Sequence, residues 1–255
     1  MSALPGFEPD WPAPANVRAW VTERGAASRY GALNLATHVG DDAAAVAVNR
    51  ERVRAALRLT AEPRWLEQVH GTRVLDLDRD AVGAADGAVT ARPGTVCAVL
   101  TADCLPVALC DRSGSRVGVA HAGWRGLLDG VLPAAVAALG SAPGDIIAWL
   151  GPAIGQAAYE VGAEVRDAFV ASSPGAERRF TANARGRWQA DLYGLARDTL
   201  AAAGVRSVHG GGFCTFTEAG RFFSHRREAP CGRMATLVWL DPAGTGVARN
   251  SGHDG

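Results

Sequence analysis

The chain has 255 residues, of which 48% are apolar and 20% charged, a composition typical of a soluble globular protein with a sizeable core. Its 26 basic and 26 acidic residues cancel, which disfavours duplex nucleic acid or an anionic lipid surface as a partner. All 26 basic residues are arginine, and the lack of lysine excludes Schiff-base catalysis, pyridoxal-phosphate anchoring and a P-loop.

The five cysteines are an odd number without paired spacing, which argues against a secreted disulfide framework and for a reducing compartment. The first ten residues contain neither the basic nor the apolar segment of a secretory signal, and no apolar run reaches transmembrane length. We therefore expect a cytoplasmic protein without a membrane partner. The sequence leaves its oligomeric state open.

Short β-branched runs separated by turn residues predict a series of strands. They cover residues 17–22, 64–70, 73–77, 95–100, 106–110, 116–121, 146–150, 205–209 and 235–240. Apolar periodicity and capping residues predict helices over residues 43–57, 126–139, 162–171 and 192–203. Pro133 would kink the second of these helices.

We expect one catalytic domain over residues 1–255, with loosely ordered termini. Residues 1–15 are Pro-rich, and residues 241–255 are Gly-rich and polar. Strands and helices mix without strict alternation along the chain, which favours an α+β architecture with mixed sheets over a doubly wound one.

Three residues that bind soft metals stand where apolar, strand-like runs meet turns: His70, Cys104 and His121. Two imidazoles and one thiolate suit zinc, and three protein ligands leave a fourth position for water or substrate, as in catalytic sites. Their separations match no compact zinc-finger pattern, and each residue alone also fits an ordinary core or surface role. Their shared placement at strand ends nevertheless indicates one catalytic metal site.

Short motifs occur in order along nearly the whole chain. They include Leu33-Asn34-Leu35, Gln68-Val69-His70-Gly71, Ala85-Asp86-Gly87, Thr101-Ala102-Asp103-Cys104, His121-Ala122-Gly123-Trp124-Arg125-Gly126, Tyr159-Glu160-Val161-Gly162 and Gly232-Arg233-Met234-Ala235. Through these motifs the chain resembles the YfiH-type family, once called multicopper polyphenol oxidoreductases or laccases and now regarded as zinc-dependent purine nucleoside phosphorylases.

The resemblance implies that His70, Cys104 and His121 bind the metal. It implies that a purine nucleoside (adenosine, inosine, guanosine or methylthioadenosine) is cleaved by phosphate, that adenosine is also deaminated, and that the fold is a layered α/β/β/α arrangement. Multicopper oxidases need about ten histidine ligands, whereas this chain has six histidines. We therefore expect zinc as the cofactor and disfavour copper.

Several residues are candidates for substrate contacts. Arg125, just before a predicted helix start, would hold phosphate together with the helix N-terminus, or else form a surface salt bridge. Asp103 would orient a ligand imidazole or move a proton, or else cap its turn. Gln68 would bind a base edge or satisfy backbone groups. Asn34, in the first motif, would contact substrate or form a turn.

Other functions would use the same metal-binding residues. Cys104 would be a thiolate nucleophile activated by His121 in a hydrolase that edits peptidoglycan precursors. A laccase-like polyphenol oxidase and a binding module with a structural metal are the remaining alternatives. Arg226 and Arg227 are weaker phosphate candidates, and the role of His225 stays open.

Overall fold

The structure is built around two β-sheets that lie face to face; it is a computed structural model and describes residues 3–26 and 28–242. The first sheet has the order β1 (Gly6–Phe7), β2 (Val17–Thr22), β14 (Met234–Leu240), β6 (Val96–Thr101) and β3 (Arg64–Trp65). The second has the order β13 (Ser207–Gly210), β9 (Ile146–Leu150), β7 (Leu105–Asp111), β8 (Val117–Ala122), β5 (Gly87–Thr90) and β4 (Val74–Asp76). Each sheet contains parallel and antiparallel pairs, which confirms the prediction of mixed sheets.

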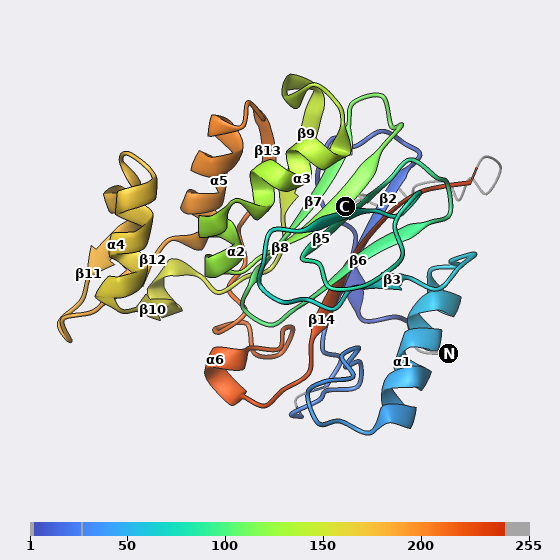
Figure 1. The fold of residues 1–255 in the computed structure, drawn as a ribbon. Helices are drawn as coiled ribbons and strands as arrows, with labels where there is room; N and C mark the ends of the chain where they lie inside the picture. The colour runs from blue at the N-terminus through green and yellow to red at the C-terminus, as the bar shows by residue number, and fades with distance from the viewer. Residues whose placement is uncertain (1–2, 27, 243–255) are drawn as a thin grey trace, which may run out of the picture.

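Helices cover the outer faces of the two sheets and complete the predicted α/β/β/α layering (Figure 1). α1 (Ala43–Ala56) covers the first sheet through an apolar cluster shared with β6 and β14. α3 (Val131–Leu139) and α5 (Leu192–Ala202) cover the second sheet. The chain therefore forms a single-domain fold of four layers.

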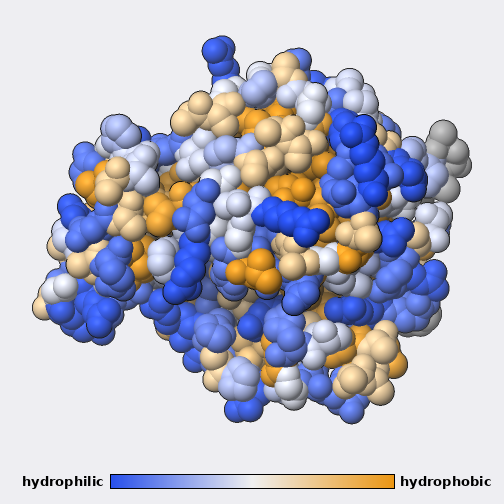
Figure 2. All heavy atoms as spheres, viewed as in Figure 1, coloured by the Kyte–Doolittle hydropathy of each residue, from blue (hydrophilic) through white to orange (hydrophobic). Residues whose placement is uncertain are grey.

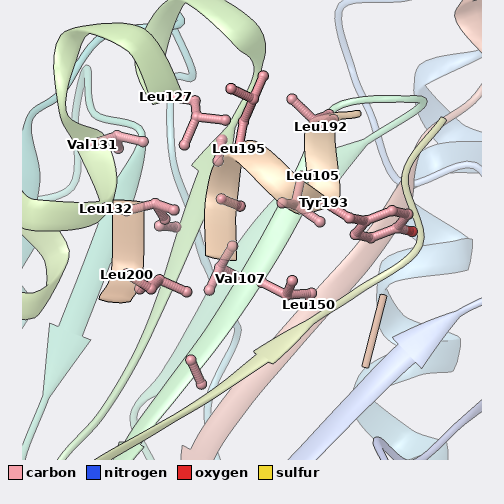
Figure 3. Close-up of a cluster of buried hydrophobic side chains, with 14 of the residues drawn as sticks. Leu105, Val107, Leu127, Val131, Leu132, Leu150, Leu192, Tyr193, Leu195 and Leu200 are labelled. Carbon is pink, nitrogen blue, oxygen red and sulfur yellow. The ribbon is translucent and has the colours of Figure 1, made fainter. Parts of the chain in front are cut away.

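Five strands of the second sheet, all except β13, contribute to two apolar layers. Figure 3 shows the layer beneath the helices, where Leu132 of α3 and Leu200 of α5 lie around Val107 of β7. Neighbouring positions along each strand point to the opposite face. Val119 of β8, for example, belongs to the same apolar cluster as Val99 of β6 in the layer between the sheets. β7 is buried at every position because both its faces are covered, which explains its continuous apolar sequence.

The helix predicted over residues 126–139 consists of two helices, so the predicted single helix is wrong. α2 (Trp124–Asp129) and α3 are divided at Gly130, whose φ of 102° lies in the left-handed region that glycine adopts readily. Pro133 falls in the first turn of α3, where no backbone N–H is needed for a helical hydrogen bond. The break therefore comes from Gly130 and not from Pro133.

Several short elements carry no clear sequence pattern. β10 (Glu160–Val161), β12 (Trp188–Ala190) and β11 (Phe180–Ala182) form a third sheet, in that order. With α4 (Ala163–Ser172) they make the lobe at the left of Figure 1. Single turns are α6 (His225–Glu228) and the 3₁₀ helices at Pro143–Asp145, Gln156–Ala158 and Ala176–Arg179.

The strand predicted over residues 64–70 pairs with β6 only at Arg64–Trp65. Beyond it, the side chain of Gln68 replaces the backbone ladder: its Oε1 accepts from Leu100 N at 2.7 Å and its Nε2 donates to Leu100 O at 2.8 Å. The chain is thereby held beside β6 while it turns away at His70, whose φ is 60°.

The expectation of a loose N-terminal entry over residues 1–15 is wrong for the described part of that segment. Gly6–Phe7 pairs with β2, and the Phe7 ring centroid lies 5.2 Å from that of Phe213. Packing of this half-buried aromatic ring against the core outweighs the Pro-rich composition around it. The corresponding expectation for the C-terminus falls mainly on residues 243–255, which lie outside the described residues.

Hydrophilic side chains dominate the face shown in Figure 2, with apolar ones in small groups between them. This is expected for helices whose apolar sides are turned toward the sheets. Over residues 3–26 and 28–242, no helix has both the length and the apolar character needed to span a bilayer.

Candidate active site

The three predicted metal ligands come together at one end of the sheet sandwich. His70 lies on the connection that crosses from β3 in the first sheet to β4 in the second. Cys104 lies on the connection from β6 to β7, which crosses between the same two sheets. His121 stands near the end of β8, opposite the start of β7. Two crossovers and one strand end thus form the site.

The donor atoms of His70, Cys104 and His121 all lie within 4.8 Å of one another. Cys104 Sγ is 3.8 Å from His70 Nε2, and the centroids of the two imidazole rings are 4.8 Å apart. The ligand atoms of a tetrahedral zinc are separated by about 3.3–3.6 Å, so these residues fit the ion after shifts on the order of 1 Å. Among the described residues, no further histidine, cysteine or carboxylate joins this group.

Asp86, which is fully buried, organises both histidines. Its carboxylate accepts hydrogen bonds from the backbone N–H groups of Val69, His70 and Gly71 at 3.2, 2.9 and 2.6 Å. These bonds hold His70 in its left-handed conformation, which costs free energy for a residue with a side chain. The same carboxylate lies 2.8 Å from His121 Nδ1, which leaves Nε2 of that ring free for a ligand role.

The electrostatics favour a thiolate at Cys104. Burial alone would raise the pKa of Cys104, but the neighbouring His121 and His70 outweigh burial and lower it. Burial alone would lower the pKa of His121, but the Cys104 thiolate and Asp86 raise it. This arrangement favours a thiolate beside an imidazolium, and the thiolate is the form that binds a metal or acts as a nucleophile.

The segment from the end of β8 through the first turn of α2 passes so close to the candidate ligands that two of its positions need glycine. A Cβ on Gly123 would lie 3.0 Å from Cys104 Sγ and 2.9 Å from His70 Cδ2. A Cβ on Gly126 would lie 2.9 Å from the carbonyl oxygen of Gly71. The two glycines therefore let α2 pack directly against the loops that carry the ligands.

The ligand group faces a cavity of about 300 Å³. His121 is only 3% exposed, whereas His70 is exposed, so the group is reached from the cavity side. The layer over the second sheet contributes the lining residues Trp124, Tyr159 and Leu192, and Ile154 comes from the connection after β9. His38, Gln68, Leu100 and Arg233 come from the side of the first sheet, and His225 and Arg226 come from α6.

Gln68 and Asn34, both predicted substrate contacts, have their amide groups occupied by the protein. Gln68 lines the cavity, but its oxygen and nitrogen are bonded to Leu100. Asn34 is fully buried; its amide bonds to Ala36 and Asp41, and its Oδ1 also accepts from the backbone N of Arg233 at 3.0 Å. These contacts correspond to the backbone and turn roles considered for the two residues.

Asp103 lines the cavity, but its carboxylate is also engaged. One oxygen accepts from Thr215 Oγ1 at 2.6 Å and the other from the backbone N of Arg226 at 2.7 Å. Its φ of 87° is left-handed, as in the turn that the sequence predicts here. Asp103 therefore ties the Cys104 loop to α6 in the manner of a capping residue.

Arg125 lies beside the site and outside the cavity lining. It is exposed, and its guanidinium carbon is 4.5 Å from the Trp124 ring centroid. Arg227 donates hydrogen bonds to the carbonyl groups of Thr215, Phe216 and Phe222 and so braces a loop. Arg226, by contrast, lines the cavity beside Tyr159.

Sequence reasoning did not assign roles to several residues of the site. Asp86 and Tyr159 stood within recognised motifs, but a single aspartate or tyrosine carries no local pattern that reveals its partners. Arg233 likewise stands in a motif, and no local pattern around His38 distinguishes it from an ordinary surface histidine. Their proximity to the ligands depends on pairing of distant strands.

Comparison with known proteins adds the family context. Residues 18–241 match the family model described as multi-copper polyphenol oxidoreductase laccase. A Pseudomonas aeruginosa protein named purine nucleoside phosphorylase is 54% identical over 236 residues, covering 91% of this chain and 97% of that protein. Purine nucleoside phosphorylase YfiH of Escherichia coli is 48% identical over 237 residues, with coverage of 91% and 97%.

Solved structures share the whole fold. A Neisseria meningitidis protein superposes with a TM-score of 0.89 at 46% identity, covering 93% of this chain and 99% of that one. YlmD from Geobacillus stearothermophilus gives a TM-score of 0.87 at 32% identity, with coverage of 95% and 98%. The layered arrangement that forms the cavity is thus found in proteins of known structure.

Proposed function

Because the chain belongs to the multi-copper polyphenol oxidoreductase laccase family, in which close relatives are named purine nucleoside phosphorylase, we propose that it is a zinc-dependent purine nucleoside phosphorylase that also deaminates adenosine. The observation that carries the proposal is the convergence of His70, Cys104 and His121 at an open cavity. Its substrates are adenosine, inosine, guanosine and methylthioadenosine, each with phosphate.

The donor set favours zinc over copper. Two imidazoles and a thiolate with an open fourth position are a ligand set of catalytic zinc. The described residues contain one such group of three ligands, whereas a multicopper oxidase needs several copper centres. Zinc held by His70, Cys104 and His121 would supply Lewis acidity to a substrate atom in the cavity.

The other residues of the cavity bind and orient the substrate. Trp124 and Tyr159 line the cavity and would supply aromatic surface against which a purine packs. Asp86 fixes the orientation of the His121 ring through Nδ1. In phosphorolysis a phosphate oxygen bonds to C1′ of the ribose while the C1′–N9 bond breaks, and the proton that phosphate gives up passes to the leaving purine. Binding both reactants side by side is the main contribution of such a cavity.

Product analysis tests the function directly. Zinc-loaded protein is incubated with adenosine, with and without phosphate, and the products are separated by chromatography. We expect adenine and ribose 1-phosphate only when phosphate is present. Inosine should form in both conditions and should be cleaved further to hypoxanthine only with phosphate. If neither phosphate-dependent cleavage nor deamination occurs at any zinc loading, the proposed function is wrong.

A second candidate, a cysteine hydrolase acting on an amide of a cell-wall precursor, is favoured by the lowered pKa of Cys104 beside His121. The two candidates predict different intermediates. If Cys104 is a metal ligand only, intact-protein mass spectrometry during turnover will show the unmodified chain mass. A trapped acyl or thioether adduct on Cys104 would favour the hydrolase instead.

A further inference from the structure

Arg233 is a fixed cation of the cavity without an anionic partner. Its Nη1 donates hydrogen bonds to the carbonyl oxygens of Cys231 at 2.7 Å and Gly232 at 3.1 Å, and its backbone N bonds to Asn34. Among the described residues, no carboxylate lies within salt-bridge distance of its guanidinium, although many other arginines of the chain are paired in this way. Its Nε and Nη2 donors make no hydrogen bond within the described chain and remain available to a ligand.

His38 adds a second polar group on the same side of the cavity. It is exposed and lines the cavity together with Arg233. Burial, and after it the charges of Arg233 and Arg50, lower the pKa of His38, so the charges that act on it are positive. This wall therefore has a positive potential.

The one carboxylate in the lining, Asp103, forms no salt bridge with Arg233. Asp103 is bonded to Thr215 Oγ1 and to the backbone N of Arg226. The guanidinium of Arg226 is likewise outside salt-bridge distance of any described carboxylate and bonds through Nη1 to the carbonyl oxygen of Glu160 at 2.8 Å. The guanidinium groups of Arg233 and Arg226 are therefore both available to bind an anion.

The basic wall formed by Arg233 and His38 and the aromatic lining residues Trp124 and Tyr159 belong to different layers of the fold. Arg233 and His38 belong to the side of the first sheet, whereas Trp124 and Tyr159 pack with the layer over the second. The metal-binding residues on the crossovers lie between the two sheets. A ligand that reached from wall to wall would pass over the metal-binding residues.

We infer that Arg233 and His38 form the subsite for inorganic phosphate, and that the purine lies against Trp124 and Tyr159 on the opposite side of the metal-binding residues. This inference rests on the proposed phosphorylase function and assigns its reactants to the two walls. A guanidinium with two free donors matches the geometry of a phosphate oxyanion, and aromatic rings match a purine face. The sequence-based candidate for phosphate, Arg125, is outside this subsite.

The test measures the KM for inorganic phosphate at saturating inosine in zinc-loaded protein. Arg233→Gln should raise this KM by about tenfold or more, because a charge-assisted contact is lost. The KM for inosine should change little, and Arg233→Lys should restore part of the phosphate affinity. His38→Asn, at an exposed position, should raise the phosphate KM to a smaller extent. Arg206→Gln, at an exposed arginine outside the cavity, is the matched control.

Calorimetric titration of inorganic phosphate into the same proteins gives an independent reading. Weaker binding in Arg233→Gln with normal zinc content and normal deamination supports the subsite. Unchanged phosphate KM and binding in both Arg233→Gln and His38→Asn would overturn it, as would a large phosphate defect in Arg125→Gln alone. An inactive wild-type protein at all phosphate concentrations would instead count against the proposed function itself. If Arg233→Gln does not fold, His38→Asn decides the question.

Discussion

Replacing Cys104 by serine, or His70 or His121 by alanine, is expected to remove the bound zinc and to lower both phosphorolysis and deamination by on the order of a thousandfold. In the proposed site three ligands would hold the ion, so loss of one would leave a pair that binds zinc weakly. Metal analysis of the purified variants should fall from about one zinc per chain to near zero. The metal analysis and the activity assays are made on the same samples.

The fold itself should survive these substitutions. The core is built from apolar layers on both faces of two sheets and does not depend on one ion, so far-ultraviolet circular dichroism should stay unchanged. Cys214→Ser and His209→Ala are matched controls, because both residues lie outside the cavity lining. Unchanged zinc content in all three ligand variants would show that the metal, if bound, is held elsewhere.

The three candidate ligands could be identified from sequence because each follows an apolar run, and such runs mark buried strands whose ends open onto a surface. What could not be predicted is that the connections carrying His70 and Cys104 both cross from one sheet to the other. Sheet membership depends on pairing between strands far apart in the chain, such as β6 with β14. Such pairing cannot be predicted from the local sequence pattern.

The same limit applies to the elements that were missed. β5 lies between β8 and β4, yet its four residues Gly87–Thr90 are too few and too small to produce a strand pattern. This short strand begins immediately after Asp86, so missing the strand also hid the residue that supports both histidines. Gln68 was predicted on the correct segment, but its partner Leu100 is on a distant strand.

Asp86→Asn is expected to weaken zinc binding by about 10- to 100-fold while leaving all three ligands in place. Asparagine has nearly the same shape, but it offers one accepting oxygen where the carboxylate offers two. Its NH₂ group must face either the amides of Val69 and Gly71 or the Nδ1 atom of His121, and buried donors that face each other are unfavourable. The support for His70 or for His121 is therefore lost.

Two measurements separate this positioning role from general destabilisation. Competition with a chelator gives zinc affinity, and the absorption of the cobalt-substituted protein reports the geometry around the Cys104 thiolate. Asp111→Asn is the matched control: Asp111 is also buried and accepts bonds from Ser113, Ser115 and the backbone of Arg116, but at the other end of β7. Both variants should lower the free energy of unfolding by about 1–3 kcal/mol. Only Asp86→Asn should change zinc affinity and the cobalt spectrum, since Asp111 does not contact a ligand; equal zinc affinity in the two variants would contradict the positioning role of Asp86.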